Sequence, residues 1–140
     1  MAEFIKPSFE IILQDDKDVV GYQRHIERIG RLCYKSGDKI TERSYEGFID
    51  RMILSKHFAM LEHGTIYLKF PIENGLILGH YLHNNYSKCI ISNSIAYITT
   101  NYRVIVENKY QDDLQYQCEP TEYHERRYSV KFTMDRIGSQ

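Results

Sequence analysis

Two stretches in the first half of the chain place apolar residues at intervals of three and four, the spacing that buries one face of a helix. The first runs from Val19 to Cys33 and follows Asp18, a residue suited to cap a helix N-terminus. The second follows Thr41, another residue suited to that position, and its apolar face is made of Tyr45, Phe48, Ile49, Met52 and Ile53. Both patterns leave charged residues on the opposite face, so we expect two amphipathic helices.

Alternating apolar and polar residues predict four strands, at 4–13, 65–70, 98–106 and 127–137. The stretch 73–86 has a helical pattern despite Gly75 and Gly79, and the polar stretch 108–126 predicts a surface excursion. Strands that alternate in this way commonly pair antiparallel with one face solvated. We therefore expect one α+β domain over residues 1–140, an antiparallel sheet packed with helices.

Composition narrows the class of protein. The chain has 140 residues, which suits one domain, and its formal charge of −1 argues against broad nucleic-acid binding. Its three cysteines, Cys33, Cys89 and Cys118, lie far apart, so the sequence supports neither a disulfide framework nor a zinc site and favours a reducing, cytoplasmic setting. The apolar stretch 75–82 is too short to span a bilayer, so we expect no membrane partner.

The most informative segment is the loop His57-Phe-Ala-Met-Leu-Glu-His63, which leads from the second helix into the strand at 65–70. Such a loop can supply a general base, metal ligands or hydrogen-bond acceptors, and ordinary capping of the helix end is the alternative. His57 and His63 are six residues apart, which excludes the His-Glu-x-x-His metal motif. Upstream, Arg31-Leu-Cys-Tyr34 closes the first helix.

Together these two blocks resemble the flavin-dependent thymidylate synthases, in which a helix ending in A-R-x-C/S-Y/F is followed by a G-H-x-S/T-x-x-E-H loop. His57, Glu62 and His63 match the loop motif directly. Ala59 stands where the family commonly has Ser or Thr, which removes one hydroxyl hydrogen bond. Lys56 replaces the usual glycine, from which we expect a less sharp turn.

The resemblance implies that His57, Ala59, Glu62 and Cys33 bind FAD as cofactor. Cys33 also lies on the apolar stripe of its helix, so simple packing is the alternative for it. The reaction implied is methylation of dUMP to dTMP, with methylenetetrahydrofolate as carbon donor and NADPH as the reductant of the flavin. A homotetramer with FAD between subunits is implied as well.

The stretch 128–140 resembles the family strand that reads apolar-x-F-x-x-x-S/D-R and leads into R-H-R-x-x-S and S-x-R-Y. Arg136 and Gln140 lie in this stretch, and the resemblance implies that they bind the substrate. Neither arginine motif occurs in the 140 residues. We therefore expect the front portion of a flavin-dependent thymidylate synthase-like domain, with a long insertion at 71–127, that is inactive alone.

Two other classes of protein stay open. One is a non-catalytic homologue that self-associates or binds a nucleotide weakly. The other, more remote, is a small metal-dependent hydrolase that uses His57, His63, His80 or His83.

The remaining polar groups are expected at the surface. These are His80 with His83, the run 101–103 and the acidic run 111–113. The basic cluster 124–127 could contact a phosphate, but we expect its arginines to pair with Glu122 or Glu125 instead.

Overall fold

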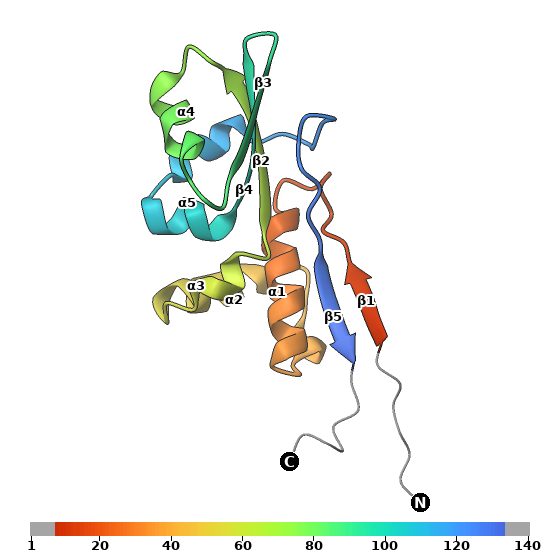
Figure 1. The fold of residues 1–140 in the computed structure, drawn as a ribbon. Coiled ribbons are helices and arrows are strands. Elements are labelled where there is room, and N and C mark those ends of the chain that lie inside the picture. Colours follow the sequence, from red (N-terminus) through yellow and green to blue (C-terminus); the bar gives the residue numbers. More distant parts are fainter. Residues whose placement is uncertain (1–7, 134–140) are drawn as a thin grey trace, which may run out of the picture.

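The computed structural model describes residues 8–133, and Figure 1 shows their fold. Its helices are α1 (Gly21–Cys33), α2 (Ser44–Leu54), α3 (Phe58–Leu61), α4 (Gly75–Leu82) and α5 (Tyr102–Asn108), with the 3-10 turns η1 (Gly37–Lys39) and η2 (Gln111–Tyr116). Its strands are β1 (Ser8–Ile12), β2 (Thr65–Pro71), β3 (Lys88–Ser92), β4 (Ile95–Asn101) and β5 (Ser129–Thr133). The protein is α+β, with small antiparallel sheets packed with helices, as the sequence pattern predicts.

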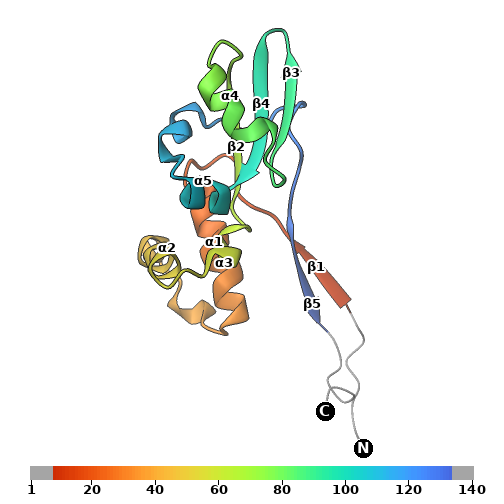
Figure 2. The same cartoon turned by 60° about the vertical axis from the view of Figure 1, so that its left-hand side comes forward.

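Within residues 8–133 the strands form two sheets where we expected one. The order β2–β4–β3 makes a three-stranded antiparallel sheet, and β1 pairs only with β5 in an antiparallel ribbon. Figure 2 shows this ribbon extending away from the larger sheet, and β5 lies beside α1 in Figure 1. The division arises because residues between β2 and β5 contribute the hairpin β3–β4, which pairs with β2 and fills the place beside it.

The predicted helices α1 and α2 pack against each other as their patterns indicate. Ile26 of α1 and Phe48 of α2 are buried in the common core, whereas Val19 lies before α1 and is exposed. Thr41 is not the cap of α2: the residue at that position is Arg43, and Thr41 instead exchanges hydrogen bonds with Ser44. At Gly30 the two helices approach so closely that a Cβ atom would lie 2.3 Å from Cζ of Phe48.

The strand predicted over 98–106 is wrong in its second half. It ends at Asn101, whose side-chain oxygen accepts a hydrogen bond from the Val104 amide at 3.0 Å and caps α5. This bond satisfies an amide that has no partner inside the helix. The apolar run that follows suits a helix face as well as a strand, so the cap decides between them.

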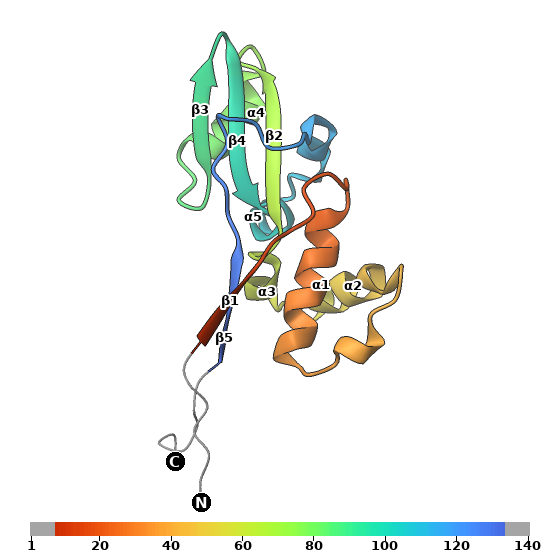
Figure 3. The same cartoon turned by 90° about the vertical axis from the view of Figure 1, so that its right-hand side faces the viewer.

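The stretch 108–126 is part of the structure's packing and not a surface excursion. Gln117 forms a bridge with Leu68 of β2, and the amide of Cys118 donates to the Tyr67 carbonyl at 2.9 Å. The ring of buried His124 is hydrogen-bonded to the Leu68 carbonyl, also at 2.9 Å. Figure 3 shows this segment crossing the three-stranded sheet. Backbone carbonyls of β2 thus accept hydrogen bonds from a segment that contains few apolar residues.

The helix predicted over 73–86 is shorter, from Gly75 to Leu82, and β3 follows it without having been predicted. In the part of the chain that the structure describes, none of the helices is both long and apolar enough to cross a membrane.

We predict opposite effects of alanine at two helical glycines. Gly30→Ala should lower the free energy of unfolding by about 1–3 kcal/mol, because the methyl group would force Phe48 out of its position. Gly79→Ala in α4 is the matched control: no atom lies within 4 Å of a Cβ there, so higher helix propensity should raise stability by about 0.5–1 kcal/mol. Urea unfolding of both variants measures this, and equal effects would contradict the close approach.

Candidate functional site

The two sequence blocks that carry the family resemblance meet in space. Tyr34, at the end of α1, and His57, just before α3, are joined by a hydrogen bond of 3.3 Å between the phenol oxygen and Nδ1. Both side chains are exposed. The loop that begins at His57 therefore lies against the end of α1, and together they form one surface.

Lys56 makes the turn that brings His57 to this surface. Its φ of 58° lies in the left-handed region, and the amide of His57 donates to the Met52 carbonyl at 2.9 Å. Both features are those of a helix that ends on glycine. The expectation of a less sharp turn is therefore wrong: lysine adopts the conformation that glycine reaches without strain.

A surface hollow of about 400 Å³ lies over this loop. Its walls hold two aromatic rings, three basic groups and two small or flexible apolar side chains, from Tyr34, Lys56, His57, Phe58, Ala59, Met60 and Arg103. Ala59 is exposed here, and it offers no hydroxyl to a ligand. The hollow is thus part aromatic and part cationic.

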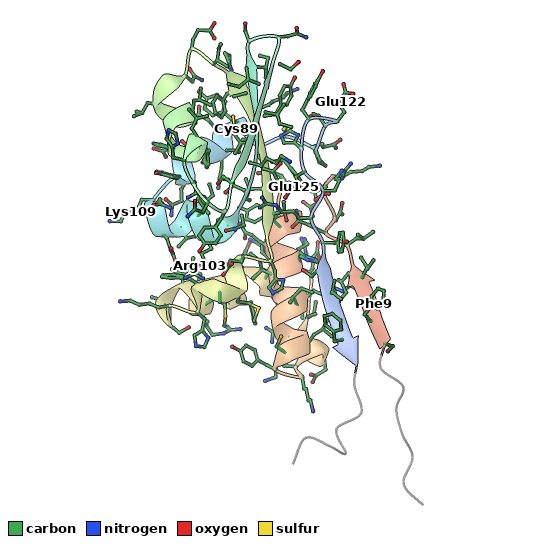
Figure 4. All side chains as sticks on the ribbon, in the orientation of Figure 1. Phe9, Cys89, Arg103, Lys109, Glu122 and Glu125 are labelled. Atoms are coloured by element: carbon green, nitrogen blue, oxygen red, sulfur yellow. The ribbon has the colours of Figure 1, made fainter. Side chains whose placement is uncertain are left out.

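Arg103 enters the hollow from α5, a part of the chain that we expected to be plain surface. Its guanidinium donates to Glu107 of the same helix at 2.6 Å and to Glu62, just after α3, at 2.7 Å. Figure 4 labels Arg103. The hydrogen bond to Glu107, and then that to Glu62, raise the pKa of Arg103 above its ordinary value. Glu62 is therefore paired with an arginine 41 positions away in the chain, a contact that no local sequence pattern predicts.

The run 101–103 is also more buried than expected, because Asn101 and Tyr102 belong to the core and only Arg103 reaches solvent.

Gly64 fixes where this loop passes α1. A Cβ atom there would lie 2.6 Å from Cδ1 of Ile26 and 3.1 Å from the Tyr22 carbonyl oxygen, so only hydrogen fits. The carbonyl of Gly64 also accepts from the Tyr102 amide at 2.9 Å, which joins the loop to α5.

Cys33 lies apart from the hollow. It is exposed, and it lines a groove of about 280 Å³ between α1 and β5 with Ile29, Leu32, Val130 and Phe132. The structure thus places His57 and Ala59 in the hollow and Glu62 beside it, paired with Arg103, whereas Cys33 lines another groove. Arg136 and Gln140 lie outside the described residues.

A second cluster, which the sequence analysis did not identify, centres on Ser129. Its hydroxyl is 2.9 Å from Nε2 of His25 and 2.9 Å from Nδ1 of His63. Burial lowers the pKa of His25 to about 4, and burial also lowers that of His63, against a raising effect of Glu62. The Ser129 hydroxyl has one proton to donate and two lone pairs that accept, so it can donate to one imidazole while it accepts from the other.

This Ser129 cluster borders a polar cavity of about 470 Å³ that Glu62, Arg126 and Arg127 also line. The two arginines are engaged: Arg127 pairs with Glu125 at 2.9 Å, as expected for the basic cluster, and Arg126 with Asp16 at 3.2 Å. Their charges are thus balanced within the protein.

His80 and Asp113 are not the surface features that we expected, whereas Gln111 and Asp112 of the acidic run are exposed, as predicted. The carboxylate of buried Asp113 lies 2.8 Å from Nδ1 of His80 and accepts from the Tyr81 hydroxyl at 2.7 Å. The His80 ring also stacks on Tyr110 with 3.8 Å between ring centres. His83 remains exposed. Residues 8–133 contain no group of three or more His, Cys, Asp or Glu side chains placed to hold a metal ion, so the hydrolase alternative gains no support.

Comparison of the chain with family models, with curated proteins and with solved structures gives no match. The fold and the site together describe an α+β protein that has an aromatic and cationic hollow over the loop His57–His63. A function for it must be argued from these residues.

We predict that Lys56→Gly raises the free energy of unfolding by about 0.5–1 kcal/mol, because glycine removes the cost of the left-handed conformation. Lys39→Gly is the control: Lys39 is equally exposed but is not in that region, so glycine there should be neutral or destabilising. Thermal and urea unfolding compare the two, and a destabilised Lys56→Gly variant would contradict the assignment.

We predict that stability falls with acid through His25. Its pKa is about 4 in the folded protein against 6.5 ordinarily, so the unfolded chain binds the proton more readily. The contribution is complete above pH 6.5 and is lost as the pH falls towards 4, by roughly 2 kcal/mol.

Urea unfolding at several pH values tests this with two variants. His25→Gln can still bond to Ser129 but does not titrate, and it should flatten the dependence of the unfolding free energy on pH. His83→Gln, at an exposed histidine, should leave the dependence as it is. The same slope in all three proteins would refute the role of His25.

Proposed function

We propose that this chain is a flavin-dependent thymidylate synthase-like unit whose loop His57–His63 contributes to an FAD site. The observation that carries the proposal is the meeting of Tyr34 and His57 over one hollow. The two sequence blocks of the resemblance are separated by the whole of α2, yet they form a single surface.

The chemistry of the hollow suits the cofactor. A flavin dinucleotide combines a flat aromatic ring system with an anionic pyrophosphate. Tyr34 and Phe58 supply aromatic surface for stacking, and Lys56 supplies positive charge, whereas the charge of Arg103 is balanced by Glu62 and Glu107. The volume of about 400 Å³ accommodates part of such a ligand rather than all of it.

Each residue has a definable task in this proposal. His57 donates or accepts a hydrogen bond at the ring edge, held in orientation by Tyr34. Glu62 and Glu107 hold Arg103 at the wall of the hollow by ion pairs, so Lys56 is the group that faces a phosphate. Reduced flavin would supply the hydride in the methylation of dUMP, with methylenetetrahydrofolate as carbon donor and NADPH as reductant. Cys33 has no part, because it lines a different groove.

A non-catalytic homologue is the second candidate function. The observation that favours it is the exposed Ala59, which gives the hollow one hydrogen-bonding group fewer than the family loop provides. Such a protein would bind nucleotides weakly or only associate with itself.

Titration with FAD, followed by quenching of flavin fluorescence, tests the proposal. We expect saturable binding by the wild-type chain and a loss of about three- to tenfold in affinity for His57→Ala, since one hydrogen bond or stacking contact is removed. His83→Ala is the control, because it deletes an exposed histidine outside the hollow. No saturable binding, or equal losses in the two variants, would refute the flavin site.

We also predict that the purified chain forms no dTMP from dUMP, methylenetetrahydrofolate, NADPH and FAD. The reason is that neither R-H-R-x-x-S nor S-x-R-Y occurs in its 140 residues, and phosphate and uracil recognition require such arginines. Product above the level of a protein-free control would show that other residues suffice.

A further inference from the structure

The Ser129 cluster, made of Ser129, His25 and His63, has no task in the flavin proposal. The Ser129 hydroxyl lies 2.9 Å from Nε2 of His25 and 2.9 Å from Nδ1 of His63, and all three side chains line the polar cavity of about 470 Å³. A serine hydroxyl that contacts an imidazole at the wall of a cavity has the geometry of an activated nucleophile. The cluster therefore has the parts of a reactive site.

The two imidazoles differ in their surroundings, and this gives them different tasks. Burial and then the neighbouring His63 lower the pKa of His25 to about 4, so a second proton on His25 is strongly disfavoured. His63 is half-buried, and the charge of Glu62 raises its pKa against the effect of burial. A ring that takes the serine proton becomes an imidazolium, which a nearby carboxylate stabilises. His63 is therefore placed to accept the proton, while Nε2–H of His25 donates to the same oxygen and orients it.

We propose that Ser129 is the nucleophile of an acyl-transfer site, with His63 as its general base, that hydrolyses esters of small, uncharged carboxylic acids. Oγ forms a bond to the acyl carbon while its proton passes to Nδ1 of His63. The imidazolium then gives this proton to the ester oxygen as the C–O bond breaks, and the alcohol leaves. Water attacks the acyl-serine in the same way, releases the acid and restores the hydroxyl.

The walls of the cavity indicate this class of substrate. Arg126 and Arg127 line the cavity, but each is paired with a carboxylate, so their balanced charges attract an anionic substrate only weakly. Arg127 uses Nε for Glu125 and Nη1 for the Tyr86 carbonyl. A guanidinium carries five N–H groups, so Arg127 has further donors to offer the oxyanion of the tetrahedral intermediate. This site does not depend on the flavin proposal.

A fluorophosphonate tests the site, because an activated serine oxygen bonds to its phosphorus and displaces fluoride. The full chain is incubated with an excess of the probe at neutral pH, and mass spectrometry of the chain and of its peptides locates the adduct. We expect a single adduct on Ser129 and none at that position in Ser129→Ala. His63→Gln keeps a hydrogen-bonding side chain but removes the base, so labelling should slow by about 10²-fold or more.

Two variants serve as matched controls. Ser92→Ala removes a hydroxyl from another strand, β3, and His83→Gln removes an exposed imidazole. Neither side chain lines the cavity, so both variants should be labelled at the wild-type rate. Turnover is measured with p-nitrophenyl acetate, whose hydrolysis by the wild-type chain should exceed that by Ser129→Ala by about 10²-fold.

A wild-type chain that stays unlabelled overturns the proposal, and so does an adduct on another residue. Equal labelling rates in His63→Gln and the wild type overturn the assignment of the base and with it the proposal. The adduct is located on the wild-type chain, so this result stands even if Ser129→Ala does not fold. If His63→Gln does not fold, wild-type labelling at decreasing pH decides, since protonation of His63 must slow it.

Discussion

The contact of Gly64 with α1 determines how the rest of the molecule is placed. At Gly64 the chain passes Ile26 and the Tyr22 carbonyl without room for a side chain. The two residues before Gly64 point in different directions. Glu62 turns to Arg103 of α5, and His63 turns to Ser129 of β5. One close approach therefore connects the helices, the larger sheet and the ribbon. A residue larger than glycine would force Ile26 or the loop itself to shift.

The sequence predicts those parts whose signal is local. The apolar spacing of α1 and α2 and the alternation in β2 follow directly from periodicity, and the prediction of an α+β protein is confirmed. The end of β4 was missed because the apolar run after Asn101 fits both periods, although the cap itself was visible in the sequence. The sequence pattern did not predict the polar pairs between residues far apart in the chain. The contacts of His25 with Ser129 and of Glu62 with Arg103 span 104 and 41 positions, and only the fold brings them together.

The candidate site shows the same division. His57 and Ala59 line the hollow because they are neighbours on one short segment, and Glu62 reaches it only through its ion pair with Arg103. The family resemblance grouped Cys33 with them, but its side chain lines the groove at β5.

Lys56 combines a strained backbone conformation with a charge at the hollow. It holds a positive charge at the edge of the hollow in a backbone conformation that costs an L-residue about 1–2 kcal/mol. A change to glycine would relieve the backbone and remove the charge in a single step. If the hollow takes an anionic ligand as proposed, the stability of the turn and the affinity for that ligand place opposite demands on this one position.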